Sequence, residues 1–296
     1  MSSLLERIAE GRVLVSDSAM GTMLQAYGLG PRECPEPWCI SHPDIVKGIA
    51  EANVAAGAEI VGTNSFGGNS IKLKPYGFAD RVVEFNQAAV ALAKEAMGNR
   101  GYVAASVGPT GRIVEEEGGD VTCAQLYDAF REQVLALANG GADAICIETM
   151  SSLHEALQAI KATKENTTLP VICTFTFEAG TKGFHTIMGV KPDRAAKVAL
   201  AAGADMIGAN CGHGIAEMIE VTRQMHAACP KVPILIHANA GSPVVENGRT
   251  VFRETPQHMA SRVPELLKAG ANIIGGCCGT TPDHIKAMAS AVRELQ

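Results

Sequence analysis

The sequence repeats one short pattern four times. In each copy a helix-like stretch ends in glycine, alanine and a polar residue follow, and an apolar run comes next. The four copies are Gly57-Ala-Glu-Ile-Val, Gly141-Ala-Asp-Ala-Ile, Gly203-Ala-Asp-Met-Ile and Gly270-Ala-Asn-Ile-Ile. Glycine ends helices because it adopts the left-handed conformation without strain. The pattern therefore predicts four helix-to-strand junctions, each leading into a short buried strand.

Four further apolar runs alternate with these copies and bring the number of expected strands to eight. The additional strands are expected at residues 13–17, 102–108, 171–177 and 234–239. Helices are expected at residues 44–56, 80–97, 122–139, 152–165, 193–202, 215–228, 256–269 and 283–294. Several of them carry a proline in or near the first turn, where its missing N–H is no loss. Pro264 falls inside the seventh helix, which is expected to kink there or to begin late.

The regular alternation of apolar strands and helices indicates the fold class. Strands that are apolar on both faces predict a parallel sheet covered by helices on its outside. Eight such units predict an α/β protein with a (β/α)8 TIM barrel, formed by one domain over residues 1–296. The alternative is an open, doubly wound sheet. The length of 296 residues also suits one barrel of about 250 residues.

Composition excludes several classes of partner. The net charge is −6 and no basic run is present, which disfavours nucleic acid and anionic membranes as partners. No apolar stretch reaches the roughly 18 residues of a membrane span, and the N-terminus lacks the apolar block of a signal peptide. We therefore expect a cytoplasmic protein. Its nine cysteines are then expected to be thiols or metal ligands rather than disulfides.

Polar or metal-binding residues follow the expected strands. The residue seven positions after each repeat glycine is Asn64, Glu148, Asn210 or Cys277, and Cys211 and Cys278 come directly after the last two. Asp17 and Asn239 end two of the other strands. In a barrel of this kind all strands point their carboxyl ends at one mouth, where active sites lie. We therefore expect these side chains to converge.

Three cysteines of this set have the pattern of a catalytic zinc site. Cys211 follows the sixth strand and Cys277-Cys278 follow the eighth, so three thiolates can meet around one tetrahedral ion. The glycines around Cys277-Cys278 allow both side chains to turn inward. Three protein ligands leave a fourth position open, as catalytic zinc sites do. The alternatives are inert buried thiols and a cysteine nucleophile.

Zinc held by three thiolates suits sulfur chemistry. The site carries a net negative charge, so it polarises carbonyl groups poorly and favours soft ligands. A substrate thiol at the open position would lose its proton at neutral pH and become a positioned nucleophile. Alkyl transfer to sulfur is the reaction class that this arrangement serves. Asn239 could bind the zinc through its amide oxygen while the thiol is absent, or could instead satisfy loop backbone.

Two carboxylates at strand ends suggest the other half of the substrate. Asp17 and Glu148 could hold an ammonium group, and the N–H groups of Ser18-Ala19-Met20-Gly21 could hold a carboxylate. Together they describe a ligand the size of an amino acid. The alternative is that each carboxylate caps the helix after its strand.

Seven segments of the chain match those of a known family. The segments are Asp17-Ser-Ala-Met-Gly-Thr-Met, Gly62-Thr-Asn-Ser-Phe-Gly-Gly-Asn, Val107-Gly-Pro-Thr-Gly, Glu148-Thr, Asn210-Cys-Gly, Asn239-Ala-Gly-Ser-Pro-Val-Val-Glu-Asn-Gly and Gly275-Gly-Cys-Cys-Gly-Thr-Thr-Pro-Asp-His. The last two are highly specific in combination. With these segments the chain resembles the zinc-dependent homocysteine S-methyltransferases, and especially the homocysteine-binding barrel of cobalamin-dependent methionine synthase. The likeness spans nearly the whole chain.

The resemblance implies roles for individual residues. Cys211, Cys277 and Cys278 would bind Zn²⁺ and carry the chemistry, while Asp17 and Glu148 would hold the amino group of homocysteine. We place four further residues in the substrate-binding set, namely Ser18, Asn64, Asn210 and Asn239. The chain departs from the family at Ser18, where glycine is usual, and at Ser152, where aspartate is frequent.

The resemblance also implies an activity and a partner. We expect methyl transfer to the zinc-bound thiolate of homocysteine, which gives methionine. Methylcobalamin on a separate corrinoid protein is the expected donor, because the Asn64 and Asn239 segments are more similar to the cobalamin-dependent branch. The chain holds only the acceptor half, so it is either a fragment or works with a donor from elsewhere. The alternatives are another thiol acceptor, a sulfonium or betaine donor, and a non-catalytic barrel that binds zinc or thiols.

Overall fold

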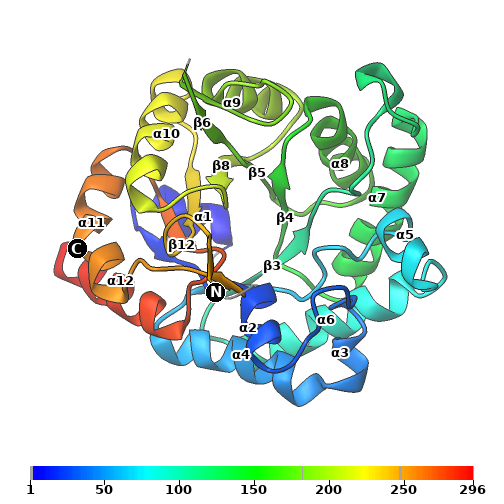
Figure 1. The fold of residues 1–296 in the computed structure, drawn as a ribbon, viewed down its shortest axis with the longest axis horizontal. Coiled ribbons are helices and arrows are strands. Elements are labelled where there is room, and N and C mark those ends of the chain that lie inside the picture. The colour runs from blue at the N-terminus through cyan, green and yellow to red at the C-terminus, as the bar shows by residue number, and fades with distance from the viewer. Residues whose placement is uncertain (1–2, 182, 247–248, 296) are drawn as a thin grey trace.

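The barrel is formed by a single parallel sheet (Figure 1). The structure is a computed structural model that describes residues 3–181, 183–246 and 249–295. Eight strands lie in the order β1-β12-β9-β8-β5-β4-β3-β2. A parallel bridge between Ser16 and Ile60 then joins the first strand to the last and completes the ring. The predicted (β/α)8 TIM barrel is confirmed, and the open doubly wound sheet is wrong.

The strands and outer helices lie within two residues of the expected positions. The barrel strands are β1 (Leu14–Val15), β2 (Ile60–Gly62), β3 (Tyr102–Val107), β4 (Ala144–Met150), β5 (Val171–Phe175), β8 (Met206–Asn210), β9 (Ile234–Ala238) and β12 (Ile273–Gly276). The outer helices are α4 (Pro43–Ala56), α6 (Val82–Met97), α7 (Cys123–Asn139), α8 (Leu153–Asn166), α9 (Pro192–Ala201), α10 (Ile215–Ala228), α11 (Pro256–Lys268) and α12 (Pro282–Leu295). No helix among those described is long and apolar enough to cross a membrane.

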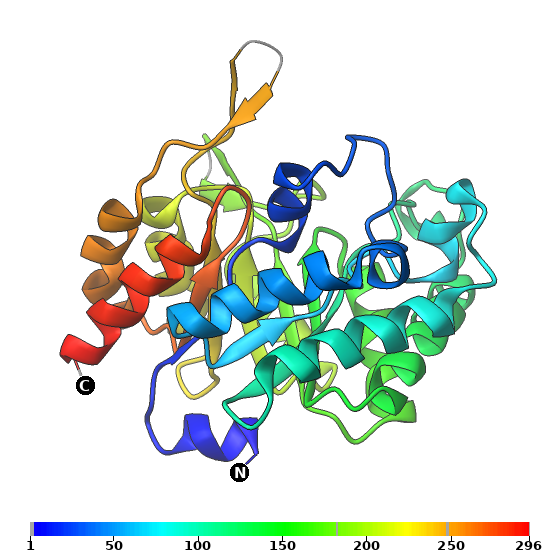
Figure 2. The ribbon, with the colours of Figure 1, turned by 90° about the horizontal axis from the view of Figure 1, so that it is seen from below.

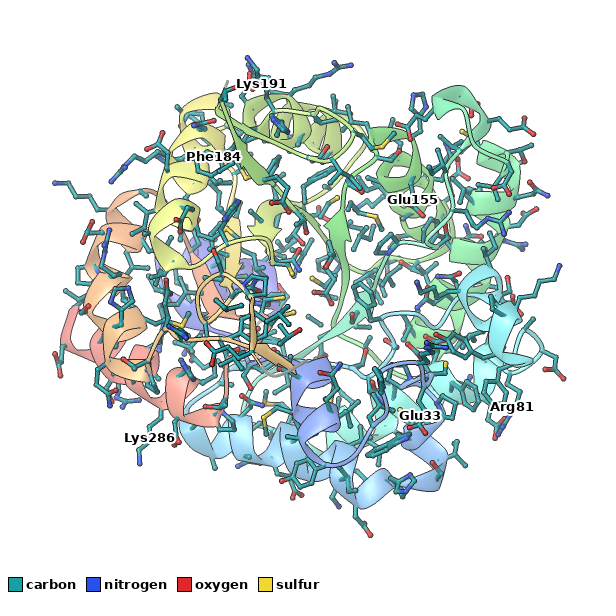
Figure 3. All side chains as sticks on the ribbon, viewed as in Figure 1. Glu33, Arg81, Glu155, Phe184, Lys191 and Lys286 are labelled. Carbon is teal, nitrogen blue, oxygen red and sulfur yellow. The ribbon has the colours of Figure 1, made fainter. Side chains whose placement is uncertain are left out.

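The repeat glycines act as the pattern predicts. Gly57, Gly141, Gly203 and Gly270 all have positive φ, between 93° and 116°. Residues with a side chain rarely adopt this conformation, so glycine is needed where the helix ends and the chain turns into the next strand. On the outer surface, the charged side chains of Arg81, Lys191 and Lys286 point away from the barrel (Figure 3).

Pro264 does not delay the start of α11. The helix begins at Pro256, where the Thr255 hydroxyl accepts a hydrogen bond from the N–H of His258 at 3.2 Å. This cap and the proline at the first position fix the start upstream. Pro264 lies on the exposed face, where water can satisfy the carbonyl group that its missing N–H leaves free. The expectation that the helix begins late is therefore wrong.

Several short elements were not expected from the sequence. They are α1 (Leu4–Ala9), α2 (Met20–Ala26), α3 (Trp38–Ser41), α5 (Ser70–Leu73), η1 (Lys74–Tyr76), η2 (Glu115–Glu117), the hairpin β6 (Glu178–Gly180) with β7 (Gly183–His185), and the hairpin β10 (Val244–Glu246) with β11 (Arg249–Val251). Each is too short to show a clear hydrophobic period. Figure 2 shows the β10–β11 hairpin projecting beyond one end of the barrel, with α1 at the other end.

The amino-terminal end of the barrel is filled. Side chains from all eight strands form one buried cluster inside the ring, and Leu4 and Ile8 of α1 pack against it. A second, larger cluster lies between the sheet and the outer helices. Among the described residues the amino-terminal end of the barrel is packed, so the route for a ligand into the interior lies at the carboxyl ends of the strands.

Candidate active site

A cavity of about 290 Å³ opens at the carboxyl ends of the strands. Seven of the nine residues predicted from the sequence line it, namely Asp17, Ser18, Asn64, Glu148, Cys211, Cys277 and Cys278. Asn210 and Asn239 are buried but do not line it. The predicted convergence at one mouth is therefore observed for the cysteines and the two carboxylates.

The three cysteines form a compact group. The Sγ atoms of Cys211 and Cys278 lie 3.9 Å apart. All three Sγ atoms lie within 4.8 Å of one another. Three thiolates at 2.3 Å from one tetrahedral zinc ion would lie roughly 3.8 Å apart. The spacing of the sulfur atoms therefore fits a zinc ion with only small adjustments.

Left-handed backbone conformations and close packing hold the side chains of these three cysteines in place. Cys211 has a φ of 61°, which is rare for a residue other than glycine, and the following Gly212 continues the turn with a φ of 74°. In the second segment a Cβ atom on Gly276 would collide with the side chain of Thr280. The N–H of Cys277 donates to the carbonyl oxygen of Ala238 at 2.7 Å, which ties this segment to β9.

The electrostatics of the group favour a cation. Hydrogen bonds from Cys277 and Cys278 stabilise the thiolate of Cys211 and lower its pKa. The same contact with Cys211 raises the pKa of Cys277. A divalent ion would neutralise the repulsion that arises when all three thiols ionise. The amide oxygen of Asn239 is buried without a hydrogen-bond partner among the described residues, while its side chain contacts Cys211. An unpaired oxygen beside three soft sulfur donors fits the donor set of zinc.

Asp17 and Glu148 form a desolvated pair of carboxyl groups. Asp17 accepts a hydrogen bond from the N–H of Gly62 at 2.7 Å, and Glu148 accepts one from the hydroxyl of Ser106. Burial raises the pKa of Asp17 to about 6. Burial also raises the pKa of Glu148 to about 7, and the charge of Asp17 adds to this shift. Two buried carboxylates beside one cavity are suited to an ammonium group.

Neither carboxylate caps the helix after its strand. The N-cap of α2 is Ala19, which makes no side-chain cap bond. The N-cap of α8 is Ser152, whose hydroxyl accepts from the N–H of Glu155 at 3.2 Å. The capping alternative for Asp17 and Glu148 is therefore wrong. Ser152 therefore acts as the N-cap of α8 and does not line the cavity.

The raised pKa values predict how stability depends on pH. Both groups have a higher pKa in the folded chain than their ordinary values of 3.8 and 4.5, so protonation favours folding. Their contribution to stability is present below pH 4 and is lost as the pH rises to about 7. Replacing Glu148 by Gln should therefore raise the free energy of unfolding at pH 8 by roughly 1–3 kcal/mol relative to the wild type, with a much smaller difference near pH 4. Urea unfolding at both pH values measures this, and equal stability at pH 8 would contradict it.

The segment after Asp17 is held differently from what the sequence suggested. The N–H of Ser18 donates to Oδ1 of Asn53 at 3.0 Å, and the N–H of Ala19 donates to Oγ1 of Thr280 at 3.3 Å. These two N–H groups, expected to hold a substrate carboxylate, are therefore already engaged. Asn53 has no counterpart in the sequence-based predictions because it lies on α4 and meets Ser18 only through tertiary packing.

Two of the predicted asparagines, Asn210 and Asn64, already form side-chain hydrogen bonds within the protein. Oδ1 of Asn210 accepts from the N–H of Thr149 and from Thr174 Oγ1, at 2.8 and 2.7 Å. Its amide nitrogen lies 3.8 Å from the Sγ atom of Cys277. Asn64 lines the cavity, but its amide nitrogen donates to the carbonyl oxygen of Pro35 at 2.7 Å. In this arrangement Asn210 contacts one of the clustered thiols and does not line the cavity.

The cavity lining includes polar residues that were not predicted from the sequence, among them Ser106, Thr149 and His237. Ser106 is the single polar residue in the apolar strand β3, and that contrast could have identified it. Thr149 has a φ of 64°, which the sequence does not reveal. The Nε2 atom of His237 is buried without a partner in the described part of the chain, and burial lowers the pKa of this residue to about 4.

Comparison with known proteins identifies the family. The model for the homocysteine S-methyltransferase family matches residues 14–292. The chain belongs to the homocysteine S-methyltransferase family. It is 33% identical to methionine synthase of Mycobacterium tuberculosis over 100% of this chain and 26% of that protein. Methionine synthase of Mycobacterium leprae is also 33% identical, over 98% of this chain and 25% of its own length. The chain therefore spans about a quarter of these family members.

Solved structures agree with the fold of this family. The metallated form of the homocysteine methyltransferase MmuM from Escherichia coli superimposes with a TM-score of 0.78 at 22% identity, covering 94% of this chain and 96% of that protein. The oxidized form gives a TM-score of 0.76 at 23% identity, with coverage of 94% and 95%. This likeness establishes the shared fold.

Proposed function

We propose that this member of the family is a zinc-dependent S-methyltransferase that converts homocysteine to methionine. The observation that carries the proposal is the group of three thiols within 4.8 Å of one another at the rim of a cavity that two buried carboxylates also line. The shared family supports homocysteine as the methyl acceptor. The alternatives are another thiol acceptor and a barrel that binds zinc or thiols without catalysis.

Each part of the cavity has a task in this proposal. Cys211, Cys277 and Cys278 would hold the zinc ion. When bound, zinc lowers the pKa of a coordinated thiol and so supplies a thiolate nucleophile at neutral pH. Asp17 and Glu148 accept hydrogen bonds from the substrate ammonium group, which fixes the amino-acid end and aims the thiol toward the cysteines. The substrate ammonium favours the ionised form of both carboxyl groups, so binding offsets their cost of burial.

The methyl donor is proposed to be methylcobalamin on a separate corrinoid protein. The cavity lies at the carboxyl ends of the strands, so donor and acceptor would meet at that mouth. The similarity to methionine synthases supports a corrinoid-associated methyl donor. Cytoplasmic location and a domain that extends over residues 1–296 belong to the same proposal.

Methyl transfer by purified protein tests this assignment. The zinc-loaded protein is incubated with homocysteine and one of three donors, namely free methylcobalamin, S-methylmethionine and betaine. Methionine formed from methylcobalamin, and at most slowly from the other two, supports the proposal. Methionine formed only from S-methylmethionine or betaine contradicts the corrinoid donor. Binding of homocysteine without transfer from any donor would favour the non-catalytic barrel.

A further inference from the structure

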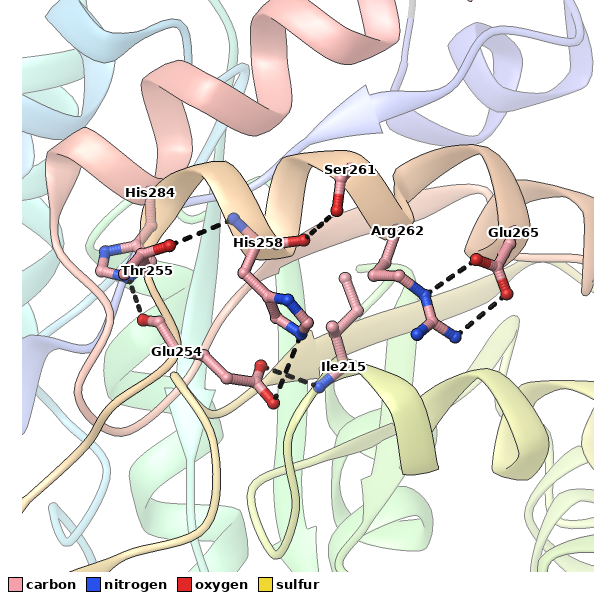
Figure 4. A network of polar contacts seen from close by, with 8 residues as sticks. All are labelled: Ile215, Glu254, Thr255, His258, Ser261, Arg262, Glu265 and His284. Carbon is pink, nitrogen blue, oxygen red and sulfur yellow. Dashed lines mark hydrogen bonds and ion pairs between the residues drawn. The ribbon is translucent and has the colours of Figure 1, made fainter.

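Glu254 contacts the three segments that carry the predicted metal-binding residues (Figure 4). It lies between the β10–β11 hairpin and α11. Its carboxylate accepts a hydrogen bond from the N–H of Ile215 at 3.3 Å, four residues after Cys211. Its carbonyl oxygen accepts from Nε2 of His284 at 3.0 Å, in the first turn of the helix that follows Cys277-Cys278. Thus the side chain and the backbone of one residue join two ligand segments.

The third segment is joined through the backbone. The N–H of Glu254 donates to the carbonyl oxygen of Ala240 at 2.9 Å, one residue after Asn239. Direct bonds between the segments complete the set. The N–H of Asn239 donates to the carbonyl oxygen of His213 and the N–H of Ala240 to that of Cys278, both at 3.0 Å. The ends of β8, β9 and β12 are therefore locked together around the thiols.

The tautomer of His284 supports a well-defined hydrogen bond to the carbonyl oxygen of Glu254. Its Nδ1 atom accepts from the N–H of Thr281 at 3.1 Å, so the proton of the neutral ring lies on Nε2. That proton points at the carbonyl oxygen of Glu254, which can only accept. The residue is 6% exposed, and both ring nitrogens are satisfied.

Two glycines make room for the Glu254 side chain. A Cβ atom on Gly214 would collide with Oε1 of Glu254, and one on Gly241 would lie 3.1 Å from its Cγ atom. Gly214 has ordinary extended backbone angles, φ −74° and ψ −177°. Alanine would fit that backbone, so the consequence of adding a side chain there is that the Glu254 carboxylate has to move aside.

We propose that Glu254 is a positioning residue for the metal site. The hydrogen bonds of Glu254, including the one from His284, hold the segments of Cys211, Asn239 and Cys277-Cys278 in register before the ion binds. This preorganisation strengthens zinc binding. The proposal rests on the zinc site of the proposed function. In this proposal Glu254 contacts neither the zinc ion nor the substrate, so replacing it is expected to change the zinc affinity first.

Alanine and glutamine replacements separate this role from general stability. Glu254→Ala should weaken zinc binding by about 10- to 100-fold, measured by competition with a chromophoric chelator. Glu254→Gln keeps an oxygen that can accept from Ile215 and should stay within about threefold of the wild type, because the hydrogen bond rather than the charge makes the link. Glu265→Ala is the control, since Glu265 pairs with Arg262 on the same helix and has no described contact with the ligand segments (Figure 4). This control should bind zinc as the wild type does.

A substitution on the opposite side of the contact gives an independent test. Gly214→Ala should displace the Glu254 carboxylate and weaken zinc binding as Glu254→Ala does. Combined with Glu254→Ala, it should cause no further loss, because the group it displaces is gone. The Gly214→Ala variant also serves if Glu254→Ala does not fold.

The outcomes distinguish the two proposals. Wild-type zinc affinity in folded Glu254→Ala overturns the positioning role, as do equal losses in Glu254→Ala and the Glu265→Ala control. Additive losses in the double variant also overturn it. A wild-type protein that binds no zinc overturns the metal site of the proposed function, and the positioning role falls with it.

Discussion

Replacement of Cys277 by alanine is expected to remove bound zinc and methyl transfer together. Only two thiols then remain, and a site with two protein ligands holds zinc weakly at neutral pH. We expect zinc affinity to fall by roughly 10³-fold or more, and turnover to fall to the background rate. Metal analysis of the purified variant and a methionine assay measure both effects on the same sample.

Cys173→Ala is the matched control for this loss. Cys173 lies in β5, is fully buried, and belongs to the packed cluster rather than to the group of three thiols. Its replacement should lower stability modestly and leave zinc content unchanged. Full methyl transfer by metal-free Cys277→Ala would contradict the proposed chemistry.

Neutralising the carboxylate pair is expected to reduce activity toward homocysteine selectively. Asp17→Asn and Glu148→Gln each remove a buried carboxylate that we propose faces the substrate ammonium group. Charged hydrogen bonds of this kind contribute about 1.5–3 kcal/mol, so kcat/KM for homocysteine should fall about 10- to 100-fold in each variant. Transfer to 2-mercaptoethanol, which has no ammonium group, should change less than about threefold. The ratio of the two rates is the measurement.

Glu155→Gln provides the comparison for a buried carboxylate of another kind. Glu155 is 5% exposed, accepts hydrogen bonds from Thr110, and does not line the cavity. Its replacement should leave the preference for homocysteine over 2-mercaptoethanol unchanged. Equal losses for both thiols in Asp17→Asn and Glu148→Gln would show that the carboxylates do not recognise the amino group.

The fold and the thiol group could be predicted because local signals specify them. Glycine after a helix, followed by an apolar run, determines where each strand begins, and the length of the run then predicts which residues lie at its carboxyl end. Cys277 and Cys278 were expected at the mouth because the glycines beside them signal a turn, and both line the cavity. The position of Cys211 follows from its place directly after β8, although its left-handed backbone does not follow from its residue type.

The remaining contacts depend on pairs that lie far apart in the chain. Ser106 meets Glu148 because β3 and β4 are neighbours, and 42 residues separate the two in the sequence. Asn210 turns toward Thr149 and Thr174 rather than into the cavity, although it follows its glycine at the same distance as Glu148 does. Whether the last side chain of a strand points into the cavity depends on the turn that follows the strand. That turn is set by tertiary contacts rather than by local residue types.

The most direct test of the central claim is X-ray absorption at the zinc edge of protein purified without chelator. We predict one zinc per chain with three sulfur neighbours near 2.3 Å and one lighter neighbour, changing to four sulfur neighbours when homocysteine is added. Protein without stoichiometric zinc, or a sulfur count that homocysteine leaves unchanged, would contradict the account.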